Sequence, residues 1–222
     1  MTQHSPTCQA VIFDMDGLLL DTEPISQRAW LRAHEALGGA PPDALFLRLI
    51  GRTRADVLRI LVEALGPAYP VAELRARKEN YFEEIITAEG IPLKPDAVAL
   101  LDYLEREGCP KAVASSTPKA SVLQRLSMTG LRERFPVIIG GDEVRRGKPS
   151  PDIFLAAAER LGITPDGCWV LEDSEYGIAA AHAAGMTPIM IPDLKPPSAE
   201  TAALAYRVLP SLAEVQAMLS RS

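Results

Sequence analysis

The sequence predicts an α/β protein with a doubly wound, Rossmann-like parallel sheet as its core and an inserted α-helical cap domain. Two observations lead to this prediction. Short apolar runs bounded by Gly, Pro or Asp alternate with longer helical segments, which is typical of a parallel sheet covered by helices. One long segment breaks the alternation because it shows only helical patterns. We expect residues 1–22 and 94–222 to form the core domain and residues 23–93 to form the cap domain.

The expected strands are apolar runs too short for buried helices. Several of them lack polar alternation, as strands covered on both faces do. The runs are Ala10–Phe13, Ala112–Ala114, Val137–Ile139, Trp169–Leu171 and Ile189–Ile191. Helices are expected between and after them, over Asp96–Glu107, Lys119–Thr129, Pro151–Leu161 and Gly177–Ala184.

The segment that follows the first strand is expected to be wholly helical. Apolar residues recur at three-to-four-residue spacing over Trp30–Leu37, Ala55–Leu65 and Ala72–Ile86, with Gly and Pro turns between these stretches. Doubly wound folds bind ligands at the carboxyl ends of their strands, so a helical insert placed here would cover that edge.

Composition excludes several classes of protein. The 222 residues are 47% hydrophobic and carry a net charge of −6, which argues against a nucleic-acid or membrane-surface protein. The cysteines Cys8, Cys109 and Cys168 are far apart and form no CxxC pair, so their spacing indicates neither a disulfide framework nor a zinc site. No segment approaches the ~20 apolar residues that span a bilayer. We expect a cytoplasmic protein without nucleic-acid or membrane partners.

Polar residues follow the first two predicted strands. Asp14 and Asp16 end the first, and such carboxylates can serve as nucleophile, metal ligand or general acid. A simple Asp-Gly turn explains them equally well. Ser115 and Ser116 follow the second strand at the start of a helix, where hydroxyl groups and free amides suit a phosphate oxygen. An ordinary helix cap is the alternative.

Two further signals come later in the chain. Lys148 lies between Gly and Pro, which limits its mobility and would let it neutralise phosphate and carboxylate charge. A solvated basic loop is the alternative. Glu172 and Asp173 end another predicted strand and resemble ligands for a hard cation, or else acidic caps of the next helix.

Taken together, the four signals are more specific than any one alone. The carboxyl ends of parallel strands share one edge, so the acids Asp14, Asp16, Glu172 and Asp173 are expected in one crevice. Two carboxylates ~4 Å apart repel by about 4 kcal/mol at an effective dielectric of 20, and four need a cation. Ligation by oxygen alone points to Mg²⁺. A metal, an anion cradle, a lysine and a free carboxylate are the parts that phosphoryl transfer requires.

These residues lie in motifs that resemble the haloacid dehalogenase superfamily, most closely its β-phosphoglucomutase-like phosphatases with a helical cap. The matching stretches, in order, are FDMDGLLLDTEP, VASST, GKPSPDIF and LEDSEYGIAAAHAAGM. The resemblance implies that Asp14 attacks phosphorus and becomes an aspartyl phosphate. Asp16 would act as general acid and base and bind the metal through its backbone carbonyl.

The same resemblance assigns the remaining residues. Ser115 and the Ser116 amide would hold the phosphoryl group, and Lys148 would bridge it to Asp14. Asp173, assisted by Glu172, would complete the metal site. In the cap, the GRTR stretch that ends at Arg54 matches a substrate-contacting motif, and Lys78 is a second expected contact. A solvated helix face is the alternative for both, and the favoured one for Lys78.

Two positions depart from the family pattern. Mutases of this group have a histidine where this chain has Ser26, which favours a phosphatase over a mutase. The family's Pro-Gly before the second strand is Pro95-Asp96 here, at a position with a structural role.

We therefore expect a monomeric Mg²⁺-dependent phosphatase that hydrolyses a small phosphorylated metabolite through an aspartyl phosphate. A sugar phosphate is the default substrate. The alternatives are a β-phosphoglucomutase-like sugar-phosphate mutase and a phospho-accepting signalling receiver. A receiver, however, would place its acidic pair before the phosphorylated aspartate and would not use Asp16.

Overall fold

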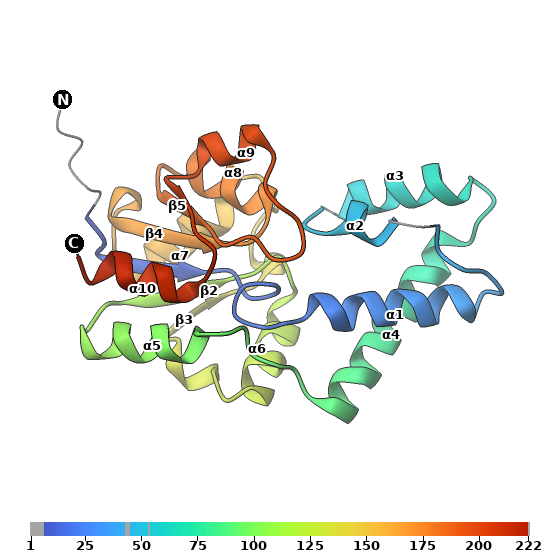
Figure 1. Ribbon diagram of the computed structural model, residues 1–222, viewed down its shortest axis with the longest axis horizontal. Coiled ribbons are helices and arrows are strands. Elements are labelled where there is room, and N and C mark those ends of the chain that lie inside the picture. The colour runs from blue at the N-terminus through green and yellow to red at the C-terminus, as the bar shows by residue number, and fades with distance from the viewer. Residues whose placement is uncertain (1–6, 43–44, 53, 222) are drawn as a thin grey trace. The chain divides into compact units, whose positions relative to one another are not determined.

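The computed structural model describes residues 7–42, 45–52 and 54–221, and the side chain of Arg54 also lies outside the described part (Figure 1). Within that part, six strands form one parallel sheet in the order β3-β2-β1-β4-β5-β6. This is the order of a Rossmann-like doubly wound sheet, which confirms the predicted fold class. The strands are β1 (Ala10–Phe13), β2 (Lys111–Ala114), β3 (Val137–Ile139), β4 (Cys168–Glu172), β5 (Thr187–Met190) and β6 (Arg207–Val208).

Burial explains why the strands are apolar without alternation. Every residue of β1, β2, β4 and β5 is buried, because helices cover both faces of the sheet. The sixth strand, β6, was not predicted. It has only two residues, both exposed, and so carries no hydrophobic signal.

Six α-helices of the described chain accompany the sheet, and the four that the sequence predicts are present. Helices α7 and α8 bury alanine-rich faces against β1, β2 and β4, whereas α10 packs against α5. The two C-terminal helices were not predicted, although Ser198 and Ser211 cap them in the usual way. The helices are α5 (Ala97–Arg106), α6 (Lys119–Met128), α7 (Asp152–Leu161), α8 (Glu175–Ala183), α9 (Ala199–Leu204) and α10 (Leu212–Leu219).

Residues 21–92 form a second unit, which we call the insert; the rest of the chain is the core unit. All its regular elements in the described residues are helices: α1 (Glu23–Glu35), α2 (Leu45–Leu49), α3 (Arg54–Leu65) and α4 (Val71–Glu89). Helix α2 was not predicted, because five residues are too few to show a helical period. The insert has its own apolar cores, one around Trp30, Leu61 and Leu74 and one around Phe82. In the part of the chain that the structure describes, no helix is both long and apolar enough to cross a membrane.

The backbone at Asp96 explains one departure from the family pattern. Among the described residues, Asp96 is the non-glycine residue with a positive φ, at 65°. This left-handed conformation is the one that glycine adopts at no steric cost. The chain adopts this left-handed conformation at the residue before α5, which suits the glycine of the family pattern, and Asp96 adopts it here at a steric cost.

The sheet order also shows where a ligand site belongs. From β1, the chain adds β2 and β3 on one side of the sheet and then β4, β5 and β6 on the other, so the strand order reverses between the neighbours β1 and β4. Ligands of open α/β sheets bind at this switch point, outside the carboxyl ends of the strands. Phe13 pairs with Leu171 in the register, so Asp14 and Glu172 come next on adjacent strands.

Candidate active site

Asp14 is fixed at the carboxyl end of β1. Its backbone N–H donates to the carbonyl of Leu171 at 3.0 Å, which continues the pairing with β4 by one residue. Only 8% of Asp14 is exposed. The carboxylate is thus held on the sheet edge by a rigid strand rather than by a loop, which suits a group that must meet a substrate in one geometry.

Lys148 lies at the centre of the site. Its Nζ donates to Asp14 Oδ1 at 2.6 Å, to Glu172 Oε1 at 2.5 Å and to the carbonyl of Ala114 at 3.1 Å. These three acceptors satisfy all three N–H donors of the ammonium. Lys148 is 6% exposed, so the solvated basic loop is not what the structure shows.

The acidic residues gather as the sequence suggests, with one exception. Carboxylate oxygens of Asp14, Glu172 and Asp173 all lie within 4.8 Å of one another. Three carboxylates and the ammonium of Lys148 carry a formal net charge of −2. The donor set consists of oxygen alone, and its charge is balanced by one divalent ion, so these residues fit a hard cation.

Two glycines make room for this cluster. An added Cβ at Gly17, which has φ +86°, would lie 2.4 Å from Asp173 Oδ2. At Gly177 an added Cβ would lie 1.8 Å from Glu172 Oε1. Both positions are closed to any side chain while the carboxylates keep these places, so the glycines of the two acidic motifs have a steric role.

Glu172 is held from both sides. One oxygen accepts from Lys148, and Oε2 accepts from the N–H and the hydroxyl of Ser174, each at 2.9 Å. The Ser174 hydroxyl in turn accepts from the N–H of Gly177 at 3.0 Å, which caps α8. The residue that caps α8 is therefore Ser174 and not one of the two acids, and Glu172 is joined to that cap through Ser174.

The exception is the side chain of Asp16. It turns toward α6, where Oδ1 accepts from Arg125 Nη1 at 3.0 Å and Oδ2 accepts from the Thr117 hydroxyl at 2.8 Å. Sequence reasoning missed both partners as site residues. Thr117 belongs to the hydroxyl run after β2 and could have been included, but Arg125, in the middle of an amphipathic helix, offers no signal.

Ser115 and Ser116 follow β2 at the same edge of the sheet. Ser115 is buried, and its hydroxyl accepts from the N–H of Thr117 at 3.1 Å. Ser116 is exposed. Gly141 approaches the loop closely, because an added Cβ there would lie 2.3 Å from the carbonyl oxygen of Ser116. Pro118 itself stands at the N-cap of α6, without a side-chain cap hydrogen bond, so the ordinary Ser or Thr helix cap is not what the structure shows.

Burial and charge set the pKa values at the centre of the site. Burial raises the pKa of Asp14 to about 7; Glu172 and Asp16 add to this effect, and Lys148 opposes it. Burial alone would lower the pKa of Lys148, but Asp14 and Glu172 outweigh it and raise that pKa above its ordinary value. Lys148 is therefore charged at neutral pH, and a cation beside Asp14 would favour the carboxylate further.

The two residues expected in the cap have different outcomes. The side chain of Arg54 lies outside the described residues, so its expected contact stays a prediction. Lys78 is not on a solvated face, since 14% of its side chain is exposed and Nζ lies 4.9 Å from the centre of the Phe82 ring. Lys78 lines a polar cavity of about 230 Å³ within the insert, together with Ser26 and Arg52.

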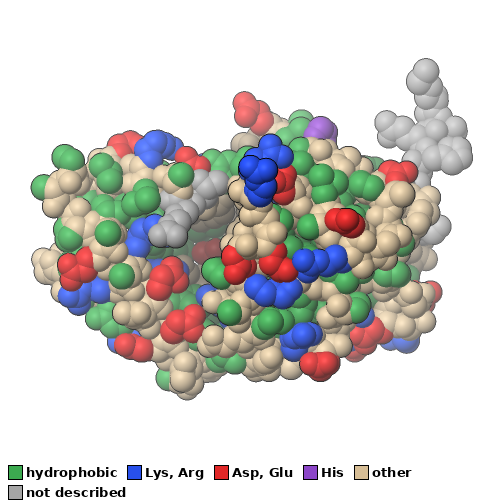
Figure 2. Space-filling model, turned by 180° about the vertical axis from the view of Figure 1, so that it is seen from behind, with side chains coloured by type: hydrophobic (Ala, Val, Ile, Leu, Met, Phe, Trp, Pro, Cys, Tyr) green, Lys and Arg blue, Asp and Glu red, His purple; other side chains and the backbone are tan. Residues whose placement is uncertain are grey.

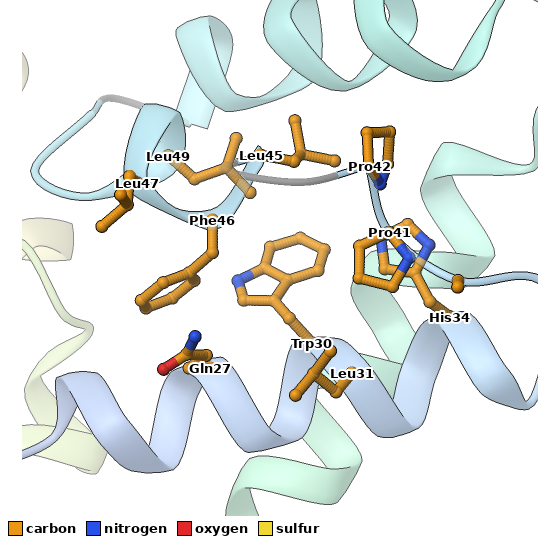
Figure 3. Close-up of a pocket in the computed structure, with 11 residues that line it drawn as sticks. Gln27, Trp30, Leu31, His34, Pro41, Pro42, Leu45, Phe46, Leu47 and Leu49 are labelled. Carbon is orange, nitrogen blue, oxygen red and sulfur yellow. The ribbon is translucent and has the colours of Figure 1, made fainter.

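The insert contains a second, apolar cavity of about 500 Å³. Figure 3 shows the indole of Trp30 rising from α1 toward Leu45 and Leu49 of α2, with Phe46 beside it. Among the described residues, the cavity is lined by apolar side chains, His34 and Gln27, and by no carboxylate. It therefore differs in chemistry from the acidic site on the sheet.

Comparison with known proteins identifies the family. Residues 8–185 match the model of the haloacid dehalogenase-like hydrolases. The chain is 35% identical over 187 residues to the Phosphorylated carbohydrates phosphatase of Thermotoga maritima, covering 82% of this chain and 83% of that protein. It is 34% identical over 184 residues to Hexitol phosphatase A of Escherichia coli, covering 83% of each.

A solved structure agrees with these relatives. The fold is similar to a HAD family hydrolase of Deinococcus radiodurans, crystallised with bound phosphate and sodium. The TM-score is 0.80 and the identity 31%, over 98% of this chain and 97% of that one. The chain belongs to the haloacid dehalogenase-like hydrolases. Within that family it is a phosphatase, which is the class of enzyme that the sequence predicts.

Proposed function

We propose that the protein hydrolyses a monophosphate ester of a small sugar-like metabolite, with Mg²⁺ as cofactor and Asp14 as the covalent nucleophile. The observation that carries this proposal is the buried Asp14 carboxylate, 2.6 Å from the Lys148 ammonium and within 4.8 Å of two further carboxylates. A nucleophile for phosphorus needs positive charge around it, and this arrangement provides one cation and room for another.

Asp14 and Asp16 divide the covalent and proton-transfer work. A carboxylate oxygen of Asp14 attacks phosphorus, the bond from phosphorus to the ester oxygen breaks, and Asp16 protonates the leaving oxygen. Water then attacks the aspartyl phosphate and gives a proton back to Asp16, and the bond to Asp14 breaks to release inorganic phosphate. Thr117 and Arg125 would set the orientation of Asp16 between these steps.

Lys148, Ser115 and Ser116 would bind the phosphoryl group. Lys148 is in direct contact with Asp14, so its charge lies where negative charge grows during the attack. Ser116 is exposed at the loop after β2, and its amide and the Ser115 hydroxyl come from the same edge as Asp14. These donors replace water around the anion without reorganisation.

Asp14, Asp173 and the backbone carbonyl of Asp16 would hold the Mg²⁺ ion. Glu172 would support them indirectly, because its two oxygens already accept from Lys148 and Ser174. When bound, the ion supplies charge that screens the repulsion between phosphate and carboxylate oxygens.

The substrate class rests on the relatives and on the insert. The relatives named above are a phosphorylated carbohydrates phosphatase and a hexitol phosphatase. The polar cavity in the insert has Ser26 where mutases of this group have a histidine, so we propose hydrolysis rather than mutation. In Figure 2, Lys and Arg side chains are interspersed with Asp and Glu on the visible face, which fits a small anionic substrate better than a nucleic acid.

Turnover of p-nitrophenyl phosphate tests the chemistry. We expect multiple turnovers with Mg²⁺, loss of activity with EDTA, and no activity in Asp14→Asn, which keeps the size of the side chain. One phosphoryl uptake without release would instead support a receiver. A panel of phosphorylated metabolites ranked by kcat/KM would then identify the substrate. Incubation with β-glucose 1-phosphate and a bisphosphate primer should give inorganic phosphate; glucose 6-phosphate would establish a mutase.

A further inference from the structure

Two cysteines far apart in the sequence, Cys8 and Cys109, meet where the strands of the core unit begin. Cys8 stands three residues before Val11, and Cys109 stands two residues before Lys111, the partner of Val11 in the sheet. The N–H of Val11 also donates to the carbonyl of Pro110 at 3.0 Å. The pairing of β1 with β2 thus brings the two thiols together at the edge opposite the acidic cluster.

The two cysteines line the same cavity, from which both thiols can be reached. The Cys8 S–H donates to the carbonyl of Ala10 and the Cys109 S–H to the carbonyl of Pro110, each at 3.7 Å. Both residues are half-buried and line a cavity of about 430 Å³ together with Tyr103 and Glu107. Cys168, in contrast, is buried inside β4.

The surroundings of the pair favour Cys109 as the nucleophile. The neighbouring Cys8 side chain lowers the pKa of Cys109, burial opposes this, and the charge of Lys111 and the N–H of Val11 lower it further. The neighbouring Cys109 side chain, together with burial, raises the pKa of Cys8. Because the thiolate is the reactive form, Cys109 is set to attack first and Cys8 second.

We propose that Cys8 and Cys109 form a reversible intramolecular disulfide by exchange with a small disulfide, such as oxidised glutathione, that enters this cavity. The Cys109 thiolate attacks one sulfur of glutathione disulfide, its S–S bond breaks, and one glutathione thiolate leaves. Cys8 then loses its proton to water, attacks the Cys109 sulfur and expels the second glutathione. Two electrons pass from the protein dithiol to the small disulfide, and two protons complete the two glutathione thiols.

The new bond would join the ends of a loop of about 100 residues that contains the whole insert. Such a link removes conformational freedom from the unfolded chain, so the oxidised protein is more resistant to heat. The site lies at the amino ends of the strands, so its chemistry is independent of the proposed phosphatase reaction.

The test uses the full-length protein titrated with oxidised glutathione in oxygen-free buffer, followed by acid quenching, alkylation with N-ethylmaleimide and mass spectrometry. We expect two of the three thiols to escape alkylation, with no glutathione retained. Trypsin should release residues 1–28 joined to residues 107–111, and dithiothreitol should restore both thiols. The Tm should rise by about 5–15 °C on oxidation.

Three serine variants assign the roles. Cys8→Ser should retain glutathione on Cys109 as a stable mixed disulfide and show no rise in Tm. Cys109→Ser should leave Cys8 reduced at the same oxidant concentration, and Cys168→Ser, the matched control, should behave as wild type. Full alkylation of wild type after exposure to oxidant, a linked peptide that contains Cys168, or glutathione retained equally by wild type and Cys8→Ser would each overturn the proposal.

Discussion

Replacing Gly177 with alanine should destabilise the core unit, although the same change in an ordinary helix is favourable. In an unobstructed helix, Gly→Ala raises the free energy of unfolding by about 0.5–1 kcal/mol. Here the new Cβ would lie 1.8 Å from Glu172 Oε1, where ordinary contacts begin at 3.4 Å. The Glu172 carboxylate would have to move by more than 1 Å.

The cost follows from what holds Glu172 in place. Its oxygens accept from Lys148 at 2.5 Å and from Ser174 at 2.9 Å, and the residue is fully buried. Overpacking costs about 1–3 kcal/mol, and a weakened hydrogen bond to a charged group costs about 1.5–3 kcal/mol. After the gain in helix propensity, we expect a net loss of about 2–4 kcal/mol.

A double-mutant cycle measured by urea unfolding tests this reasoning. Trp169 lies in β4 and Trp30 in the insert, so Trp169 fluorescence in a Trp30→Phe background reports on the core unit. In a Glu172→Ala background the obstacle is gone, and Gly177→Ala should then stabilise the protein by about 0.5–1 kcal/mol. An equal loss in both backgrounds would refute the clash with Glu172.

Three other substitutions give separate tests. Gly17→Ala should weaken Mg²⁺ binding by about tenfold or more in calorimetry, because its Cβ would displace Asp173. The control is Gly162→Ala, which is also at a positive φ but has open space around it, and it should bind Mg²⁺ as the wild type does. Asp96→Gly should raise the free energy of unfolding by about 0.5–1 kcal/mol, because glycine adopts the left-handed backbone without strain; a loss would show that the aspartate side chain is needed. Burial would raise the pKa of Glu143, but the Gly140 N–H and two basic side chains hold it at about 2. The ionised carboxylate therefore adds about 1 kcal/mol to the free energy of unfolding above pH ~4.5, and this stability is lost as the pH falls toward 2. Glu143→Gln should remove that part of the acid sensitivity in unfolding curves, and an unchanged slope would contradict the assignment.

Much of the fold was predictable because the strands are buried on both faces. The predicted bounds of β1 and β3 agree with the structure, since an uninterrupted apolar run is the signature of such strands. The elements that were missed are α2, α9, α10 and β6, which have between two and eight residues, so their periodicity is too weak to read. Their stability comes from contacts within the folded chain rather than from a local pattern.

The candidate site was predictable where motif residues end strands. Asp14 and Glu172 meet because parallel strands bring their carboxyl ends to one edge, and Lys148 reaches them from the segment between β3 and α7. The orientation of Asp16 was not predictable, since it depends on Arg125, 109 residues further along the chain. Spacing within a motif can show that a carboxylate reaches the edge, but not which partner fixes its side chain.

The central claim, a covalent bond between Asp14 and phosphorus, can be tested by trapping the intermediate. The enzyme, mixed with Mg²⁺ and a good phosphate-ester substrate, is quenched in acid within a single turnover, digested and analysed by mass spectrometry. The account predicts a phosphoryl group on the peptide that contains Asp14, at that residue, and none in Asp14→Asn. Normal turnover by Asp14→Asn, or a phosphoryl group on another residue, would contradict it.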